Sequence, residues 1–350
     1  MIKYLKLFYH LARARVKRKP SKLNFVITSF CNSKCLTCNI WKNPKSSDEL
    51  TIQEIEQVFQ KLPDTVCWLS ITGGEPASRN DLPDIFKAAI KHIPNLSLIG
   101  MPTNGLYQPR LLSLAEELMK IENHPMIIVT LSIDGSEETH DRVRGVPGGF
   151  KRTWDTYTKL KELTRRDTNF MVGIETTVSS LNVDTVLPFL KSLVADKHMV
   201  SVTFAHEAYL YQNVSGDSAK GIVPQNVQRV QEIVDFVGKK FRWWHPQDII
   251  ERSYVSNVPQ YLKNPAKKVV PCMSLISTIS MNAFGIVTPC LMWGKKLGTV
   301  RDAEYDIQSI YDSPLSEETR REIRADKCPN CWTPCEAYQS VLWSKIPFMK

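Results

Sequence analysis

The chain has 350 residues, of which 43% are hydrophobic and 23% charged, and this composition excludes a disordered or fibrous protein. The net charge is +9, but residues 1–20 hold seven lysines or arginines and no acid, so the other 330 residues carry only +2. A nearly neutral body does not favour a nucleic-acid partner, and no apolar run reaches the roughly 20 residues needed to span a bilayer.

The first predicted element is a basic amphipathic helix over residues 1–21. Its apolar residues recur at three- and four-residue spacing, which predicts one hydrophobic face: Tyr4, Leu5, Phe8, Leu11, Ala12 and Val16. Charges interrupt the apolar run, which is not typical of a secretory signal. Two interpretations stay open. The helix lies on an anionic membrane surface, or it packs across the open end of the domain with its basic residues in water.

Residues 22–240 alternate between short apolar runs and helix-length amphipathic runs. The runs predict strands at 23–30, 66–72, 96–103, 126–133, 170–178 and 200–206. They predict helices at 51–61, 81–92, 110–121, 151–166, 183–194 and 224–240. Thr51 and Glu54 form a capping-box signature at the first helix. Six strand–helix units predict an α/β fold, a partial (β/α)6 barrel that resembles an open TIM barrel.

Polar or glycine-rich motifs follow five of the six predicted strands. They are the cysteine loop at 31–38, "GGEP" at 73–76, "TNG" at 103–105, "SIDG" at 132–135 and "ETT" at 175–177. The carboxyl ends of parallel strands meet at one rim, where sites of such folds lie. We therefore expect these motifs to converge.

Nine cysteines without an export signal favour reduced thiols, metal ligation and a cytoplasmic protein. Three of them, Cys31, Cys35 and Cys38, lie within eight positions of one loop. A structural zinc site needs four ligands, and no fourth cysteine or histidine lies nearby. A 4Fe–4S cube can be held by three cysteines, which leaves one iron open for another ligand.

The motif Cys31-Asn-Ser-Lys-Cys35-Leu-Thr-Cys38, followed by Gly73-Gly74-Glu75-Pro76, resembles the signature of the radical S-adenosylmethionine (radical SAM) family. The resemblance implies that the three thiolates hold a 4Fe–4S cluster whose open iron binds SAM. An electron from the cluster would cleave SAM, and the resulting 5′-deoxyadenosyl radical would abstract a substrate hydrogen. It also implies an electron donor such as a ferredoxin or flavodoxin.

The same resemblance assigns SAM contacts to the rim motifs. The backbone of residues 73–75 would receive the SAM amino group, and Arg144 in "HDRVRG" would contact the SAM carboxylate. Hydrogen bonds to ribose and carboxylate would come from Thr103, Asn104, Ser132, and Thr176 or Thr177. Four residues after the sixth strand are candidate catalytic acids or bases, with a solvated loop as the alternative: His206, Glu207, Tyr209 and Tyr211.

Residues 241–271 are predicted as a linker, irregular over 256–271, and residues 272–350 as a small cysteine-rich domain. Two strands are predicted within 274–293, joined by a turn at 282–285, and a helix at about 315–325. The cysteine spacing is similar to the SPASM and twitch extensions of the family, which implies one auxiliary 4Fe–4S cluster. Its ligands would be Cys272, Cys290, Cys328 and Cys331, with Cys335 spare or substituting for one of them. A zinc site built from the same four thiolates is the alternative.

Together these interpretations predict an oxidoreductase-type radical SAM enzyme that acts on a peptide, a protein or a small molecule. If the first helix binds membranes, the substrate would instead be a lipid or a lipid-linked molecule at the membrane surface. The alternative from another class is a zinc-stabilised scaffold without redox chemistry.

Overall fold

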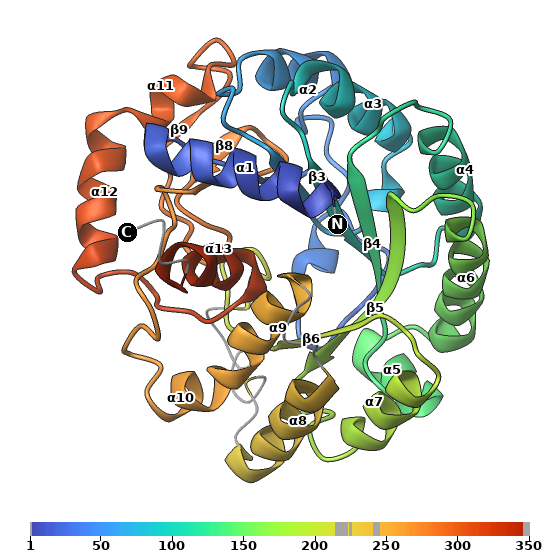
Figure 1. Cartoon of the computed structure of the whole chain (residues 1–350). Helices are drawn as coiled ribbons and strands as arrows, with labels where there is room; N and C mark the ends of the chain where they lie inside the picture. The colour runs from blue at the N-terminus through green and yellow to red at the C-terminus, as the bar shows by residue number, and fades with distance from the viewer. Residues whose placement is uncertain (1, 214–222, 224–225, 241–245, 346–350) are drawn as a thin grey trace.

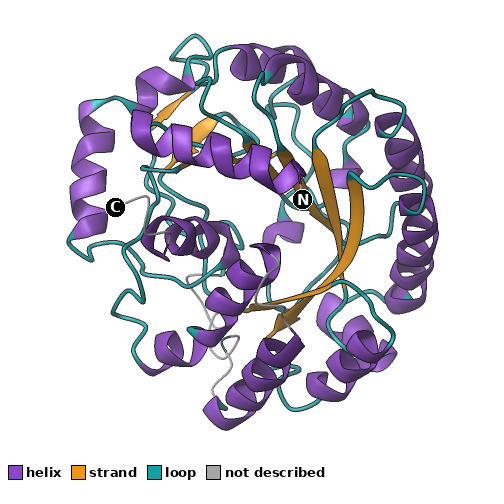
Figure 2. Ribbon diagram, viewed as in Figure 1, coloured by secondary structure: helices purple, strands orange, loops and turns teal. Residues whose placement is uncertain are grey.

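The computed structural model describes residues 2–213, 223, 226–240 and 246–345. Its frame is a curved nine-stranded sheet in the order β6-β5-β4-β3-β2-β1-β7-β8-β9. Strands β1 to β7 run parallel to one another, whereas β8 pairs antiparallel with β7 and β9 pairs antiparallel with β8. Helices surround the sheet (Figures 1 and 2), and the edge strands β6 and β9 do not pair. The predicted partial barrel is therefore confirmed.

Each strand and helix predicted between residues 22 and 240 is present in the described part of the chain. The strands are β1 Lys22–Val26, β2 Trp68–Thr72, β3 Leu98–Thr103, β4 Met126–Ser132, β5 Phe170–Val178 and β6 Val200–Phe204. The helices are α2 Ile52–Gln60, α3 Leu82–His92, α4 Gln108–Leu118, α6 Gly149–Thr164, α7 Val186–Ala195 and α8 Val227–Lys240. Residues 224 and 225, also predicted as helical, lie outside the described residues. One further helix, α5 Glu137–Arg144, was not predicted, because it is short and mostly polar.

The predicted capping box begins α2. The Thr51 hydroxyl accepts a hydrogen bond from the Glu54 backbone N–H at 3.3 Å, and the Glu54 carboxylate accepts one from the Thr51 N–H at 2.9 Å. Glu54 also accepts hydrogen bonds from Arg301 at 2.7 Å and from the Tyr305 hydroxyl at 3.2 Å. The start of α2 is therefore tied to the C-terminal part of the chain.

Helix α1, Ile2–Lys17, lies across one end of the barrel (Figure 1). Leu7 and Leu11 are buried there in a cluster with Leu98 and Met126, which lie near the starts of β3 and β4. Of the two interpretations of this helix, the structure therefore shows the one in which the helix packs on the domain. The predicted composition of the apolar face is partly wrong, because Leu5 and Val16 are exposed at 63% and 84%.

The predicted linker contains two helices, α9 Pro246–Ser256 and α10 Val258–Lys263. The prediction of irregular structure over 256–271 is therefore wrong for the residues of α10, and residues 241–245 lie outside the described residues. Helix α9 packs against β6, α8 and the C-terminal helix α13, Pro334–Lys345. Its packing makes this segment part of the domain.

The predicted C-terminal hairpin is present as β7 Thr278–Met281 and β8 Ile286–Thr288, followed by β9 Gly298–Thr299. Asn282 closes its turn, because its Oδ1 accepts from the Phe284 and Ile286 N–H groups at 3.0 Å each. Helices α11 Ile307–Tyr311 and α12 Pro314–Arg324 follow, and α12 matches the helix predicted at 315–325. Since β7 pairs with β1, this region extends the barrel sheet.

Helix α13 lies inside the curve of the sheet (Figure 1), and buried polar contacts hold its first turn. Lys22 donates to the Cys335 carbonyl at 2.8 Å. The Glu336 carboxyl accepts from Asn24 at 3.1 Å and from Thr278 at 2.7 Å. Helix α13 is thereby attached to β1 and β7. None of the described helices has the length and hydrophobicity that crossing a membrane requires.

Candidate active site and cysteine-lined pockets

Cys31, Cys35 and Cys38 lie in the loop that follows β1, and all three side chains are partly buried. Burial raises the pKa of the Cys31 thiol to about 12 and that of Cys38 to about 12, and the charges of the neighbouring thiols contribute to both shifts. Such thiols remain protonated at neutral pH unless a cation stabilises the thiolate form. The loop therefore gathers three sulfur donors that fit the irons of a cluster.

Close backbone contacts position this loop against the glycine motif. The Gly74 N–H donates to the Thr28 carbonyl at 2.9 Å, and the Glu75 N–H donates to the Phe30 carbonyl at 2.8 Å. A Cβ atom at Gly74 would lie 2.1 Å from the Phe30 carbonyl oxygen. Only glycine permits this approach, so the second predicted motif supports the first. Pro76 is buried and opens the short 3-10 helix Pro76–Ser78.

The Glu75 side chain joins three loops at the rim. It is 1% exposed and accepts hydrogen bonds from the Thr103 hydroxyl at 2.6 Å and from the Asn104 N–H at 2.7 Å. Asn104 in turn donates to Asn32 at 2.7 Å and to Ser33 at 2.8 Å, both inside the cysteine loop. Burial raises the pKa of Glu75. The side chain of Asn104 holds the cysteine loop in place, and the SAM contacts predicted for Thr103 and Asn104 stay predictions.

Arg144 lies at the same loop, as its motif predicts. Its guanidinium donates to both carboxylate oxygens of Asp134, at 2.6 and 3.0 Å, and it also hydrogen-bonds the Cys35 sulfur. Asp134 accepts a further hydrogen bond from the Thr177 N–H at 2.9 Å. Arg144 thus places a positive charge beside the thiolates, while the Asp134 carboxylate balances it.

The ends of β4 and β5 supply the remaining predicted SAM contacts. Ser132 ends β4 and is partly buried. Thr176 is fully buried, and its hydroxyl donates to the Ile133 carbonyl at 2.8 Å. Because side chains alternate along a strand, Thr177 shares the inner side of β5 with Glu175, and Thr176 faces the other side. The SAM contact of Thr176 or Thr177 stays a prediction, and Thr177 is the one that shares a side of β5 with Glu175.

The four catalytic candidates after β6 have different surroundings. His206 is buried, donates to the Phe204 carbonyl at 2.6 Å and stacks on Tyr261 with ring centroids 5.1 Å apart. Burial lowers the pKa of His206 to about 4, which favours the neutral imidazole, and its role as a catalytic candidate stays a prediction. Glu207 is exposed, and Tyr209 packs over Gly294. Tyr211 alone of the four lines the interior of the barrel.

That interior is a cavity of about 770 Å³, which we call the central chamber. Inner-face residues of β1 to β6 line it, together with residues of α8, α9 and α13. Sequence reasoning missed two titratable residues of its wall, Glu251 and Tyr338, because they lie outside the motifs. It named Glu175 only as part of the "ETT" motif, and it named Cys335 only as a candidate cluster ligand.

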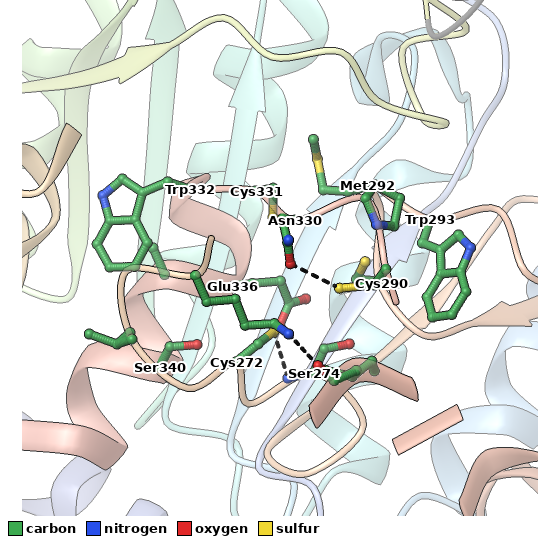
Figure 3. Close-up of a pocket in the computed structure, with 16 residues that line it drawn as sticks. Cys272, Ser274, Cys290, Met292, Trp293, Asn330, Cys331, Trp332, Glu336 and Ser340 are labelled. Carbon is green, nitrogen blue, oxygen red and sulfur yellow. Dashed lines mark hydrogen bonds between the residues drawn. The ribbon is translucent and has the colours of Figure 1, made fainter. Parts of the chain in front are cut away.

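A second pocket collects the C-terminal thiols (Figure 3). Cys272, Cys290, Cys328 and Cys331 all line it, although they come from two segments nearly 40 residues apart. Burial raises the pKa of the Cys331 thiol to about 12 and also raises the pKa of Cys272 and Cys290, with neighbouring thiols adding to each shift. This four-thiol pocket is a donor set of the kind that a cluster or a zinc ion requires.

Cys335 does not belong to that pocket. It lines the central chamber instead, one helical turn before Tyr338. Across the described ranges, no three histidine, cysteine or acidic side chains converge on a point suited to one metal ion. In a cube each thiolate binds a different iron, so its ligands stand further apart than those around a single ion.

Comparisons with known proteins show which family and which relatives this chain is similar to. Residues 25–181 match the Radical SAM superfamily. The chain is 24% identical over 327 residues to Fe-coproporphyrin III synthase of Methanosarcina barkeri, covering 89% of this chain and 76% of that protein. It is 29% identical over 168 residues to the sporulation killing factor maturation protein SkfB of Bacillus subtilis, covering 48% and 38%. The chain thus spans well under half of the second relative's length.

Solved structures share the fold. Native anSMEcpe with bound AdoMet superposes with a TM-score of 0.61 at 17% identity, covering 92% of this chain and 95% of that one. Streptococcus suis SuiB bound to S-adenosylmethionine gives a TM-score of 0.60 at 16% identity, covering 86% and 68%. At these identities the likeness concerns the architecture.

A partial parallel barrel with a three-cysteine loop at its carboxyl rim defines a class of cluster-binding α/β enzymes. The cysteine loop and the "GGEP" motif both lie within the matched residues. Residues 25–181 belong to the radical SAM superfamily, and the cysteine spacing of the C-terminal region is of the SPASM/twitch type. The protein is an enzyme whose family cofactors are a 4Fe–4S cluster and SAM.

Proposed function

We propose that this enzyme cleaves SAM reductively at the Cys31–Cys35–Cys38 loop and abstracts a hydrogen atom from a substrate bound in the central chamber. When bound, the cluster supplies the electron that breaks the S–C5′ bond of SAM. The observation that carries the proposal is the junction between loop and chamber. The Asn39 N–H, directly after Cys38, donates to the carbonyl of Tyr211 at 2.8 Å, and Tyr211 lines the chamber.

The chain's own residues hold and polarise this junction. Asn213 donates to the Thr37 carbonyl at 3.0 Å, which fixes the loop after β6 to the cysteine loop. Arg144 supplies positive charge at Cys35. Tyr211 and Glu175 face the chamber beside this loop, and burial raises the pKa of both side chains. They would orient a substrate and hold protons without adding charge.

The substrate class follows from the relatives only in part. SkfB is a maturation protein for a killing factor, and a SuiB structure holds its precursor peptide SuiA. These names support a peptide or protein substrate, whereas Fe-coproporphyrin III synthase supports a small molecule. A ferredoxin or flavodoxin would serve as the electron donor.

We assign one auxiliary 4Fe–4S cluster to Cys272, Cys290, Cys328 and Cys331. Helix α13 separates this pocket from the central chamber. Glu336, Ala337 and Ser340 of α13 line the auxiliary pocket, whereas Cys335 and Tyr338 of the same helix line the chamber. An electron leaving a substrate radical would therefore have only this helix to cross. Cys335 has no place among the ligands in this assignment.

Iron content and SAM cleavage test both assignments after anaerobic reconstitution. The wild-type protein should hold roughly eight irons, the content of two cubes. Replacing Cys31, Cys35 and Cys38 with alanine should halve the iron and abolish 5′-deoxyadenosine formation. The double variant Cys328→Ala/Cys331→Ala should halve the iron and keep that formation.

Cys335→Ala is the matched control and should keep the full iron content. A loss of half the iron in this variant would contradict the proposed ligand set. One zinc ion per chain, retained by the triple variant and lost from the double variant, would replace the auxiliary cluster with a structural zinc site.

A second candidate property is association with an anionic membrane surface through α1. Leu5, Tyr9 and Val16 form an exposed apolar stripe on this helix, and Lys6 and Arg18 are exposed beside them. Such a face fits a lipid interface. Against it, Arg13 and Lys17 both pair with Asp64 and so are partly neutralised.

Liposome co-sedimentation tests the membrane candidate. The wild-type protein should bind vesicles of phosphatidylserine and phosphatidylcholine more than vesicles of phosphatidylcholine alone. The variant Leu5→Ser/Tyr9→Ser/Val16→Ser should lose this binding. Val227→Ser/Leu315→Ser, which changes exposed apolar residues elsewhere, should keep it. Equal sedimentation of all three proteins would remove the membrane candidate.

A further inference from the structure

The central chamber exists because small residues replace the usual filling of a barrel. The interiors of closed barrels are packed by layers of bulky branched side chains. Here the chamber-lining positions in the middle of five successive strands are small or short: Ser70, Gly100, Thr130, Gly173 and Ser201. A Cβ atom added to Gly100 would meet no atom within 4 Å. The space beside Gly100 is therefore open, whereas the Met199 side chain fills the space beside Gly173.

The chamber changes character along its length. At the end that α1 covers, the wall comes from the starts of the strands and from Tyr4 of α1, and it combines apolar side chains with Lys22, Lys197, His198 and Lys240. Trp68, Leu98, Ile128 and Met171 line this end, and they share a hydrophobic cluster with Tyr4, Leu7 and Leu11 of α1. At the end near the cysteine loop, the wall carries Glu175, Tyr211 and Cys335.

A third wall, formed by α9 and α13, offers an unused hydrogen-bond acceptor. Glu251 of α9 is 6% exposed and lines the chamber, and its Oε2 atom has no hydrogen-bond partner. Its carboxyl does hydrogen-bond Tyr338 of α13. A buried carboxyl oxygen without a donor is costly, so a donor from a bound molecule would be favoured there.

We infer that the central chamber binds an amphiphilic substrate with an extended apolar chain and at least one hydroxyl or amide hydrogen-bond donor. The polar end lies near Tyr211 and the cysteine loop, and the chain runs past Gly100 toward α1. Glu251 accepts the donor. Each methylene group buried in this way increases affinity about fourfold. The inference rests on the proposed function, because it names the substrate class of the same site.

The open space at Gly100 permits a sharp test. Gly100 lacks a positive φ angle, and its missing Cβ has room, so Gly100→Leu should fold and fill the chamber. Gly238→Leu in α8 is the matched control, because a Cβ there also meets no atom within 4 Å and Gly238 does not line the chamber. The probe is parinaryl alcohol, an 18-carbon polyene alcohol whose fluorescence rises in apolar surroundings.

Reconstituted wild-type protein and Gly238→Leu should bind the probe with equal dissociation constants, and Gly100→Leu should bind at least tenfold more weakly. Equal binding by Gly100→Leu, or no binding by the wild type, would overturn the inference. Displacement of the probe by an apolar peptide but not by hexadecanol would also overturn it.

Failure of the proposed function has a different signature. In that case wild-type protein and Gly238→Leu would form no 5′-deoxyadenosine, whatever the probe does. Iron content and the thermal unfolding midpoint of Gly100→Leu serve as the checks that this variant is folded and loaded.

Discussion

Single residues at the rim show that buried charges hold the cysteine loop. Arg144 and Asp134 are 16% and 2% exposed in their side chains, and they make two hydrogen bonds to each other. Neither could be buried alone without a large desolvation cost. The pair therefore lets a guanidinium lie beside Cys35 inside the domain.

Replacing Asp134 with asparagine should leave Arg144 as a buried charge without its counter-ion. The expected loss in the free energy of unfolding is about 3–5 kcal/mol, measured by anaerobic urea unfolding followed by circular dichroism. Glu137→Gln is the control, because it breaks the exposed Lys151–Glu137 pair and should leave the unfolding midpoint unchanged. Equal midpoints for Asp134→Asn and Glu137→Gln would show that the buried pair has no such role.

The residues of the rim also show what sequence motifs can predict about a site. The "GGEP" and "TNG" motifs predicted a site at this rim, and their direct contacts with SAM stay a prediction. The structure adds that the carboxylate of Glu75 and the side chain of Asn104 connect the loops to each other. A motif predicts where in the fold a site lies. The hydrogen-bond partners of its side chains depend on loops that come together from distant positions in the chain.

Among the elements, α2 begins with a local capping motif, and one residue of this motif also contacts a distant part of the chain. Thr51 acts only as the N-cap of the helix. Glu54 completes the capping box and also binds Arg301 and Tyr305. The hydrogen bond from Arg301 is the main cause that lowers the pKa of Glu54 to about 2. This one carboxylate therefore connects α2 to the C-terminal region.

Thr51→Ala should lower the free energy of unfolding by about 1 kcal/mol, and Glu54→Gln should lower it further at pH 7. Because the folded-state pKa of Glu54 is depressed, its contribution is present above its unfolded value of about 4.3 and is lost as pH falls toward 2. The difference between wild type and Glu54→Gln in urea unfolding should therefore shrink below pH 4. A difference that is constant from pH 7 to pH 3 would contradict this assignment.

Helix α1 shows that hydrophobic periodicity predicts a helix but does not predict which of its sides is buried. Its spacing predicted one apolar face, yet the structure buries Leu7 and Leu11 and exposes Leu5 and Val16. A helix with apolar residues on both sides has no single preferred rotation in the sequence alone. The contacts with Leu98 and Met126 select the side that faces the barrel.

At the scale of the whole molecule, the two cysteine sites differ in how they depend on metal. The main hydrophobic core joins β1 to β6 with their surrounding helices and continues into β7, β8 and α11 to α13. The C-terminal pocket brings together four thiols, and burial raises the pKa of three of them, Cys272, Cys290 and Cys331, which disfavours their thiolate forms. Metal binding there should couple to the folding of the surrounding segment.

Removing iron with a chelator should therefore loosen the C-terminal region first. Hydrogen exchange should become faster in residues 272–293 and 326–345, whereas β2 to β5 should keep their protection. Mass spectrometry of peptic fragments before and after chelation would measure this. Uniformly faster exchange over the whole chain would mean that the barrel also depends on its clusters.

The sequence by itself determined the strand–helix order, the open barrel, the cysteine loop at its rim and the C-terminal hairpin. These features follow from periodicity and local spacing, which act between near neighbours in the chain. Only the tertiary structure decided that β7 extends the sheet, that Cys335 faces the chamber and that Thr176 does not. The physical reason is that a side chain's face depends on which distant elements dock against it. Lys22 and Glu336 hold α13 in the orientation that separates Cys335 from the other four thiols.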